Sequence, residues 1–334
     1  MQPIFKFMQI AFLMSFFYSY CFAEANVDLF GDDSAKGEEV LREYATHLAK
    51  LVDKKWKMEE KYQFNLPEKV QAKLQKERAK MCSLIKNKGN YLYVDFETVY
   101  YPDENTHYTT IEVIKKEEKH RLKWLKDQEA EPKPQLEKND LITAMQNYIK
   151  KGMELMLNHE LDVNSIQCTG YHCLFGFENP QLKPYKEQFS QGVITDKFLI
   201  IQTLAQDKDK ARRAASVFLV GEFTNPHEIL ATLLPYVKDK DEEVRNNAMR
   251  VIANTMHKSG YKKVDIMPFI ELLDSPYESD RNKALFVLLE AASLTKQNLA
   301  IRLLAEDKLK QLAKLTQPNN KLFAQQILAK LTKQ

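Results

Sequence analysis

Four segments near the C-terminus repeat one pattern, and this repetition constrains the fold more than any other feature of the sequence. In each segment a basic residue precedes an alanine by three positions, and two apolar residues follow three and four positions after that alanine. The basic residue and the alanine are Arg212 and Ala215, Arg245 and Ala248, Arg281 and Ala284, and Lys321 and Ala324. Such self-similarity is typical of stacked repeats, in which no single unit can bury its apolar face alone.

An apolar, helix-like segment precedes each of these blocks, so each repeat unit is predicted to be a helical hairpin. These preceding segments are 198–204, 229–237, 266–273 and 299–315. The alanine lets the inner helix approach its neighbour closely, and the apolar pair fills the seam between hairpins. We therefore predict a mostly α-helical protein whose residues 193–334 form an α-solenoid of about four hairpins.

The repeats resemble the HEAT-repeat (armadillo-like) family. Repeats of that family carry an aspartate-containing turn, then valine and arginine, then a small residue, and the segment from Asp239 to Val244 and Arg245 fits this pattern. Asp207 before Arg212 fits in part, and Asp280 replaces the valine before Arg281. The resemblance implies a solenoid whose second helices line a concave surface. It implies no particular activity, because this scaffold serves many unrelated tasks.

Arg212, Arg245 and Arg281 recur once per repeat and are predicted to form a structural ladder. We expect each of them to pair with a turn aspartate or with a helix end in the next hairpin. A ladder of charges on a surface seldom marks a functional site, so these arginines are assigned to the fold.

The opposite face of the inner helices is the predicted partner-binding surface, and it comprises Asn246, Arg250, Asn282, Phe286 and Leu289. Exposed apolar residues are typical of partner sites. The alternative for Phe286 and Leu289 is burial under a neighbouring helix. Val217 and Val220 are apolar at equivalent positions of the first repeat, and we expect the N-terminal region to cover them there.

The region before the repeats mixes helices with one predicted β-hairpin. Aromatic and β-branched residues alternate on both sides of a turn centred on Pro102 and Asp103, which predicts two antiparallel strands. The predicted organisation is a flexible mature N-terminus over 24–36, an α+β region over 37–128 with its β-hairpin at 90–114, a linker over 129–138, and a helix plus a Cys168/Cys173 loop over 139–192.

Residues 1–23 have the features of a signal peptide, with a basic start, an uncharged apolar stretch and small residues before a cleavage site at Ala23. The protein is therefore expected to be exported to the periplasm or the extracellular space. Retention of this segment as a membrane anchor is the alternative. The net charge of the chain is +3 and no basic stripe is visible, so nucleic acid is not expected as a partner.

The cysteines and the missing catalytic motifs decide the functional prediction. An oxidising compartment favours a disulfide between Cys168 and Cys173 and leaves Cys82 as a free, buried thiol. No catalytic triad, phosphate-binding or metal-ligand motif is present, so no catalytic residue, metal or cofactor is assigned. We predict a non-catalytic scaffold that binds a protein partner. The alternative is an exported enzyme or metal-binding protein with its site between His159 and Cys173.

Overall fold

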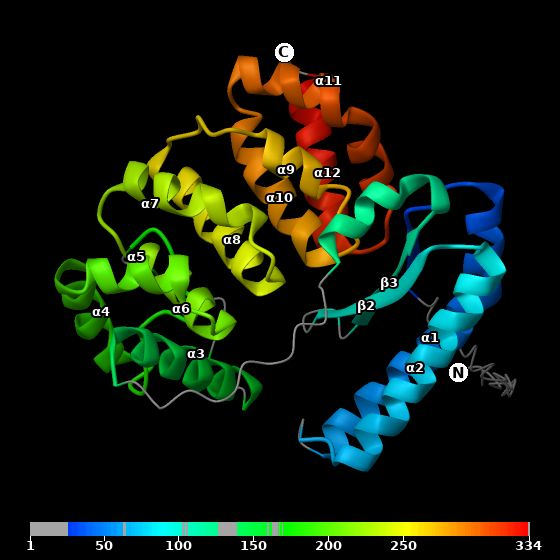
Figure 1. The fold of residues 1–334 in the computed structure, drawn as a ribbon, viewed down its shortest axis with the longest axis horizontal. Coiled ribbons are helices and arrows are strands. Elements are labelled where there is room, and N and C mark those ends of the chain that lie inside the picture. Colours follow the sequence, from blue (N-terminus) through cyan, green and yellow to red (C-terminus); the bar gives the residue numbers. More distant parts are fainter. Residues whose placement is uncertain are drawn as a thin grey trace, which may run out of the picture.

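The computed structural model describes residues 26–62, 65–101, 104, 106–125, 139–158, 160–161, 166, 168 and 170–332. Within these ranges the protein is mostly α-helical with one small sheet, as predicted (Figure 1). The N-terminal part comprises β1 (Val27–Phe30), α1 (Ala35–Lys61), α2 (Glu68–Gly89), β2 (Tyr93–Tyr101), β3 (Thr106–Ile114) and the 3-10 segment η2 (Lys116–Trp124). No helix among the described residues is both long and apolar enough to cross a membrane.

The sheet has the strand order β1-β3-β2. Strands β2 and β3 form the predicted antiparallel hairpin, with Phe96 opposite Ile111. One face of the hairpin buries Val94, Phe96 and Ile111 against the long helical hairpin of α1 and α2. Because β3 is the central strand, β2 has a ladder partner on one side only and is an edge strand of the described sheet.

The prediction of a flexible segment over 24–36 was wrong for its described residues. Residues 27–30 form β1, which pairs in parallel with β3, and α1 already begins at Ala35, where the Ser34 side chain accepts a hydrogen bond from the backbone of Gly37. Successive side chains of β1 pack against different parts of the protein. Val27 faces α1 and α2, whereas Asp28 contacts the repeats at Thr316. A strand of four residues is too short for its period to be visible in the sequence.

The remaining helices stack side by side as hairpins in the order predicted (Figure 1). The hairpins are α5 (Lys197–Gln206) with α6 (Lys210–Val220), α7 (Pro226–Leu233) and η4 (Leu234–Lys238) with α8 (Glu242–Ser259), α9 (Met267–Leu272) with α10 (Glu278–Ala291), and α11 (Thr295–Leu312) with α12 (Pro318–Leu331). Two more helices, α3 (Leu141–Leu157) and α4 (Lys183–Thr195), precede them, and α3 packs on α6.

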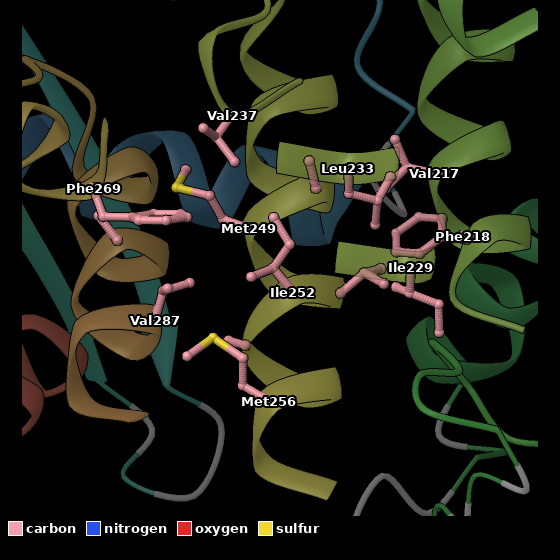
Figure 2. Close-up of a cluster of buried hydrophobic side chains, with 14 of the residues drawn as sticks. Val217, Phe218, Ile229, Leu233, Val237, Met249, Ile252, Met256, Phe269 and Val287 are labelled. Atoms are coloured by element: carbon pink, nitrogen blue, oxygen red, sulfur yellow. The ribbon is translucent and has the colours of Figure 1, made fainter. Parts of the chain in front are cut away.

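The seams between hairpins are apolar and fully buried. Figure 2 shows Phe269 of α9, Met249 and Ile252 of α8 and Val287 of α10 filling the space between neighbouring layers. The four repeat alanines are each at most 1% exposed, which lets the inner helices approach one another closely. Each layer therefore depends on its neighbours for burial, as in other stacked repeats.

The second face of the sheet packs on the last two hairpins rather than on the first repeat. The expectation that the N-terminal region covers Val217 and Val220 of the first repeat was therefore wrong. Asp28 accepts a 2.7 Å hydrogen bond from the backbone of Thr316, and Arg121 donates to the carbonyl oxygen of Asp274 at 2.8 Å. This face carries buried carboxylates, which match the backbone donors and arginines at the ends of the last hairpins. The first repeat is covered instead by α3 and by His172, whose ring stacks on Phe218.

The three ladder arginines are buried and connect successive layers. Arg212 contacts the turn residue Asp207 at 3.0 Å and Asp140 at the start of α3 at 2.7 Å. Arg245 reaches forward to Asp280 of the next hairpin at 2.8 Å. The third, Arg281, binds Glu112 of strand β3 and thereby joins the stack of helices to the sheet.

Candidate ligand-binding groove

A cavity of about 650 Å³ lies where the N-terminal part meets the repeats. Its walls come from α1 and α2, from strand β2, and from the first residues of α8 and α10. A cavity of this size suits a small molecule or a short stretch of polypeptide. We call it the junction groove, and it is defined by Trp56, Arg78, residues 96–100, His107, Glu242, Glu278 and Ser279.

One wall of the junction groove is the outer edge of β2. Five consecutive residues of this strand, Phe96 to Tyr100, line the cavity. The carbonyl oxygen of Phe96 points outward and accepts a hydrogen bond from Arg78 at 2.6 Å. Alternate residues of a strand direct their backbone groups to the same edge. Thr98, which is exposed, therefore presents its own N–H and C=O groups toward the groove.

A second wall is aromatic. The rings of Trp56 and Tyr100 lie 4.5 Å apart between centroids, and the ring of His107 lies 4.7 Å from that of Trp56. Burial lowers the pKa of His107, so this ring is neutral at pH 7. The cluster is thus an uncharged, half-buried surface on which an apolar group or a cation can pack.

The third wall is acidic. Glu242 and Glu278 are the first residues of α8 and α10, and Glu97 accepts a 2.8 Å hydrogen bond from the backbone N–H of Glu278. Burial, helped by the neighbouring Glu112, raises the pKa of Glu97 to about 8. The lining contains four glutamates, one more being Glu59, and two bases, Lys55 and Arg78. Glu97 keeps its proton at pH 7, and a cation that enters the groove would meet carboxyl oxygens on this wall and favour the ionised form of Glu97.

The raised pKa of Glu97 predicts a pH-dependent stability. The unfolded chain ionises this carboxyl near pH 4.5, whereas the folded protein keeps the proton until about pH 8. Unfolding therefore releases a proton between these values, and the contribution of Glu97 to stability falls as pH rises through this window. We expect the Glu97→Gln variant to lose less stability than the wild type between pH 5 and 8, as measured by urea unfolding. Parallel pH profiles for the two proteins would contradict this assignment.

The five residues of the predicted partner-binding surface lie one or more turns further along α8 and α10. Asn246 and Asn282 are buried, and Asn246 donates to Asp280 of the neighbouring helix at 3.0 Å. Phe286 stacks on Phe323 of α12 with 5.5 Å between ring centroids. Arg250 and Leu289 are half-buried. Most of this predicted surface is therefore engaged between helices.

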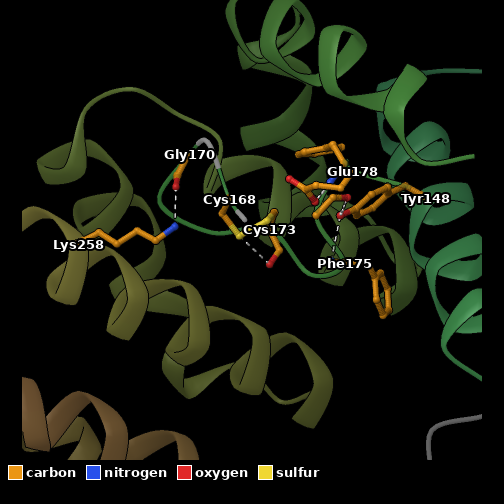
Figure 3. The surroundings of a disulfide bond; sticks show 9 residues. Tyr148, Cys168, Gly170, Cys173, Phe175, Glu178 and Lys258 are labelled. Atoms are coloured by element: carbon orange, nitrogen blue, oxygen red, sulfur yellow. Dashed lines mark hydrogen bonds between the residues drawn. A yellow bond between two sulfur atoms is a disulfide. The ribbon is translucent and has the colours of Figure 1, made fainter. Parts of the chain in front are cut away.

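Cys168 and Cys173 lie at disulfide distance, with 1.98 Å between their sulfur atoms (Figure 3). Their loop is attached to α8 through Lys258, which donates to the carbonyl oxygen of Gly170 at 2.9 Å. His172 is buried. No cluster of three or more possible metal ligands occurs among the described residues, and His159 lies outside them.

Loss of the Cys168–Cys173 disulfide is expected to have a moderate effect. The bridge closes a loop of only six residues, for which chain entropy gives about 2 kcal/mol of stabilisation. We expect the double variant Cys168→Ser/Cys173→Ser to be less stable by this amount in urea unfolding without reductant. If the thiols were reduced in the native protein, the variant and the wild type would have nearly equal stability.

Cys82 carries a free thiol that contacts Asp95. Burial raises the pKa of this thiol to about 11, so little reactive thiolate is present at pH 7. This environment suits the structural role that the sequence predicts. The proposed cleavage position, Ala23, lies outside the described residues.

The comparisons with known proteins add little to this description. No family model matches the chain, and no curated protein matches it significantly. Among solved structures, the designed armadillo repeat protein YIII(Dq)4CqI matches 57% of this chain and 90% of its own length, at 17% identity and a TM-score of 0.36. A similarity this low supports no functional argument. The helical repeat fold follows from the stacked hairpins themselves, and membership of the HEAT family stays a prediction.

Proposed function

We propose that this protein is an exported, non-catalytic binding protein that holds an extended segment of a partner polypeptide in the junction groove. The observation that carries the proposal is that five consecutive residues of an edge strand line the cavity. An edge strand can accept another chain as an additional strand through backbone hydrogen bonds. Here the edge of β2 faces a cavity large enough to admit such a segment.

The side chains around the groove support a basic segment as the occupant. A lysine or arginine of the partner would place its cation among Glu97, Glu242 and Glu278 and its aliphatic stem against Trp56 and Tyr100. Such a cation would also favour the ionised form of Glu97 and thus release its proton. Backbone pairing supplies affinity in this mode of recognition, and the side-chain pockets supply specificity.

A peptide-library selection on the whole protein tests the proposal. From random twelve-residue peptides we expect enrichment of lysine and arginine, with binding at least about tenfold weaker in Trp56→Ala and in Glu97→Gln. Thr98→Pro removes an outward N–H group and should abolish binding, whereas the matched variant Thr98→Val should bind like the wild type. Leu303, which is 74% exposed on α11, serves as a distant control position for alanine substitution.

Three results of this selection would contradict the proposal. The first is enrichment of acidic peptides. The second is a set of basic peptides that bind Thr98→Pro and Thr98→Val with the same affinity. The third is a set of peptides that bind the Trp56→Ala variant as tightly as the wild type. Circular dichroism and the melting temperature of each variant show whether a loss of binding reflects unfolding.

Export is the second element of the proposal. It is supported by the composition of residues 1–23 and by the short-range disulfide, a type of bond that persists in oxidising compartments. We expect the mature protein, purified from its native source, to begin at Glu24. A mature chain that retains residues 1–23 would contradict cleavage and favour the anchored alternative.

A further inference from the structure

Helices α8 and α10 lie side by side in a constant register. Asn246 contacts Ser279 at 3.4 Å near one end of the pair, and His257 contacts Glu290 at 3.0 Å near the other end. Both contacts join residues that are 33 positions apart. Arg250 and Lys283 have the same separation and lie one turn beyond Asn246 and Ser279. The register therefore places the two basic side chains next to each other, which agrees with the effect of the Arg250 charge on Lys283.

Arg250 is half-buried, and its guanidinium group forms no hydrogen bond or ion pair with a described residue. The residue at the equivalent position one repeat earlier, Val217, is apolar and buried. The nearby His172 is kept neutral by burial and by the positive charges of Arg250, Lys258 and Lys283, which lower its pKa to about 3. The three ladder arginines, by contrast, each contact a carboxylate.

Lys283 is in a similar position. Its ammonium group donates to the side-chain oxygen of Asn282 at 2.6 Å and forms no salt bridge with any described residue. Burial and the charge of Arg250 lower the pKa of Lys283 to about 8. The side-chain nitrogen of Asn282 is itself buried and has no hydrogen-bond partner in the described part of the chain.

The charge of Glu278 acts on Lys283 and raises its pKa, but no described carboxylate forms an ion pair with Lys283 or Arg250. Glu278 accepts a hydrogen bond from Asn320 at 3.2 Å, and Glu290 contacts Lys262 and His257. Two adjacent cations that are partly removed from water are unfavourable unless an opposite charge compensates them. Arg250 and Lys283 therefore lie next to each other without an ion pair to any described residue, and the unpartnered amide nitrogen of Asn282 belongs to the residue beside Lys283.

We propose that Arg250, Lys283 and the amide of Asn282 form a binding site for an oxyanion, either a carboxylate or a phosphate group. Guanidinium and ammonium groups bind such oxygens through charge-assisted hydrogen bonds. The site lies between α8 and α10 and is separate from the junction groove, whose lining contains none of its three residues. It does not depend on the proposed peptide binding, and its preferred ligand has the opposite charge.

Titration calorimetry with inorganic phosphate, at constant ionic strength in chloride, tests this site directly. We expect saturable binding to the whole protein and an affinity at least about tenfold lower in Arg250→Gln and in Lys283→Gln. The control variants Arg302→Gln and Lys296→Gln, at exposed positions of α11, should bind like the wild type. A parallel titration with acetate shows whether a carboxylate is preferred to phosphate.

Thermal stability provides a second readout in case a variant binds poorly for structural reasons. In phosphate-free buffer, Arg250→Met should have a higher melting temperature than the wild type, because it removes one of two adjacent uncompensated charges. Phosphate should raise the melting temperature of the wild type but not of this variant. The Trp56→Ala groove variant should keep its phosphate affinity, which separates this site from the groove.

Two binding outcomes overturn the proposal. One is a wild-type protein that binds neither phosphate nor acetate in the calorimeter. The other is an Arg250→Gln protein that binds these anions as tightly as the wild type. A decrease in the melting temperature of Arg250→Met in phosphate-free buffer also contradicts it, since the guanidinium would then be compensated within the protein.

Discussion

Replacement of Glu112 by alanine is expected to lower the free energy of unfolding by about 3–5 kcal/mol. Glu112 is 1% exposed on β3, and its carboxylate accepts two hydrogen bonds from Arg281 of α10, one of them at 2.9 Å. Arg281 is fully buried and also lies against the ring of Phe30, 3.9 Å from its centroid. The variant leaves this buried guanidinium without its carboxylate. An unpaired buried charge lowers the stability far more than the removal of both charges does.

A double-mutant design separates this effect from a general loss of packing. The pair Glu112→Leu/Arg281→Met removes both charges and should recover much of the lost stability. Glu306 pairs with Lys310 on the surface, and Glu306→Ala should change the stability far less than Glu112→Ala does. Denaturation by urea measures all of these variants. If Glu112→Ala behaved like Glu306→Ala, the sheet would not be docked on the repeats as described.

Phe269→Ala should lower the free energy of unfolding by a similar amount, about 3–5 kcal/mol. The ring is fully buried between α8 and α10, where Figure 2 shows it among Met249, Val237 and Val287. Removing it leaves a cavity that stacked helices can close only by shifting the neighbouring layer. Because each hairpin depends on its neighbours for burial, the damage should also lower the cooperativity of unfolding.

Urea denaturation followed by circular dichroism gives both the midpoint and the slope of the transition. Leu303→Ala on α11 is a suitable control, because this large apolar residue is 74% exposed and should cost little. A Phe269→Ala protein with the stability of the control would show that the seam between α8 and α10 is not packed as the structure describes.

The repeats could be predicted because their pattern lies within short segments and occurs four times in the sequence. Each alanine and each following apolar pair occupies the same place in its hairpin, so the sequence contains independent evidence for the same interface. Strand β1 carries no such redundancy. It has four residues, and its partner β3 lies about eighty residues further along the chain. The parallel pairing depends on tertiary packing that no local pattern reveals.

The junction groove was missed for a related reason. Trp56, Tyr100, Glu97 and Glu278 come from α1, β2 and α10, and each is an unremarkable residue within its own element. Only the docking of the sheet on the last two hairpins brings them together. One feature of the sequence did point to this docking. Asp28 and Glu112 are carboxylates within apolar strand segments, and in the structure they accept hydrogen bonds from a backbone N–H group and from an arginine of the last two hairpins.

In the proposed complex, one bound polypeptide contacts both parts of the protein at their junction. Hydrogen exchange measured by mass spectrometry, with and without a basic peptide from the library selection, would locate this contact on the protein. We expect slower exchange of backbone amides in β2 from Glu97 to Tyr101 and in the first turns of α8 and α10 when the peptide is bound. Protection confined to a single part of the molecule, or found only at α11 and α12, would contradict it.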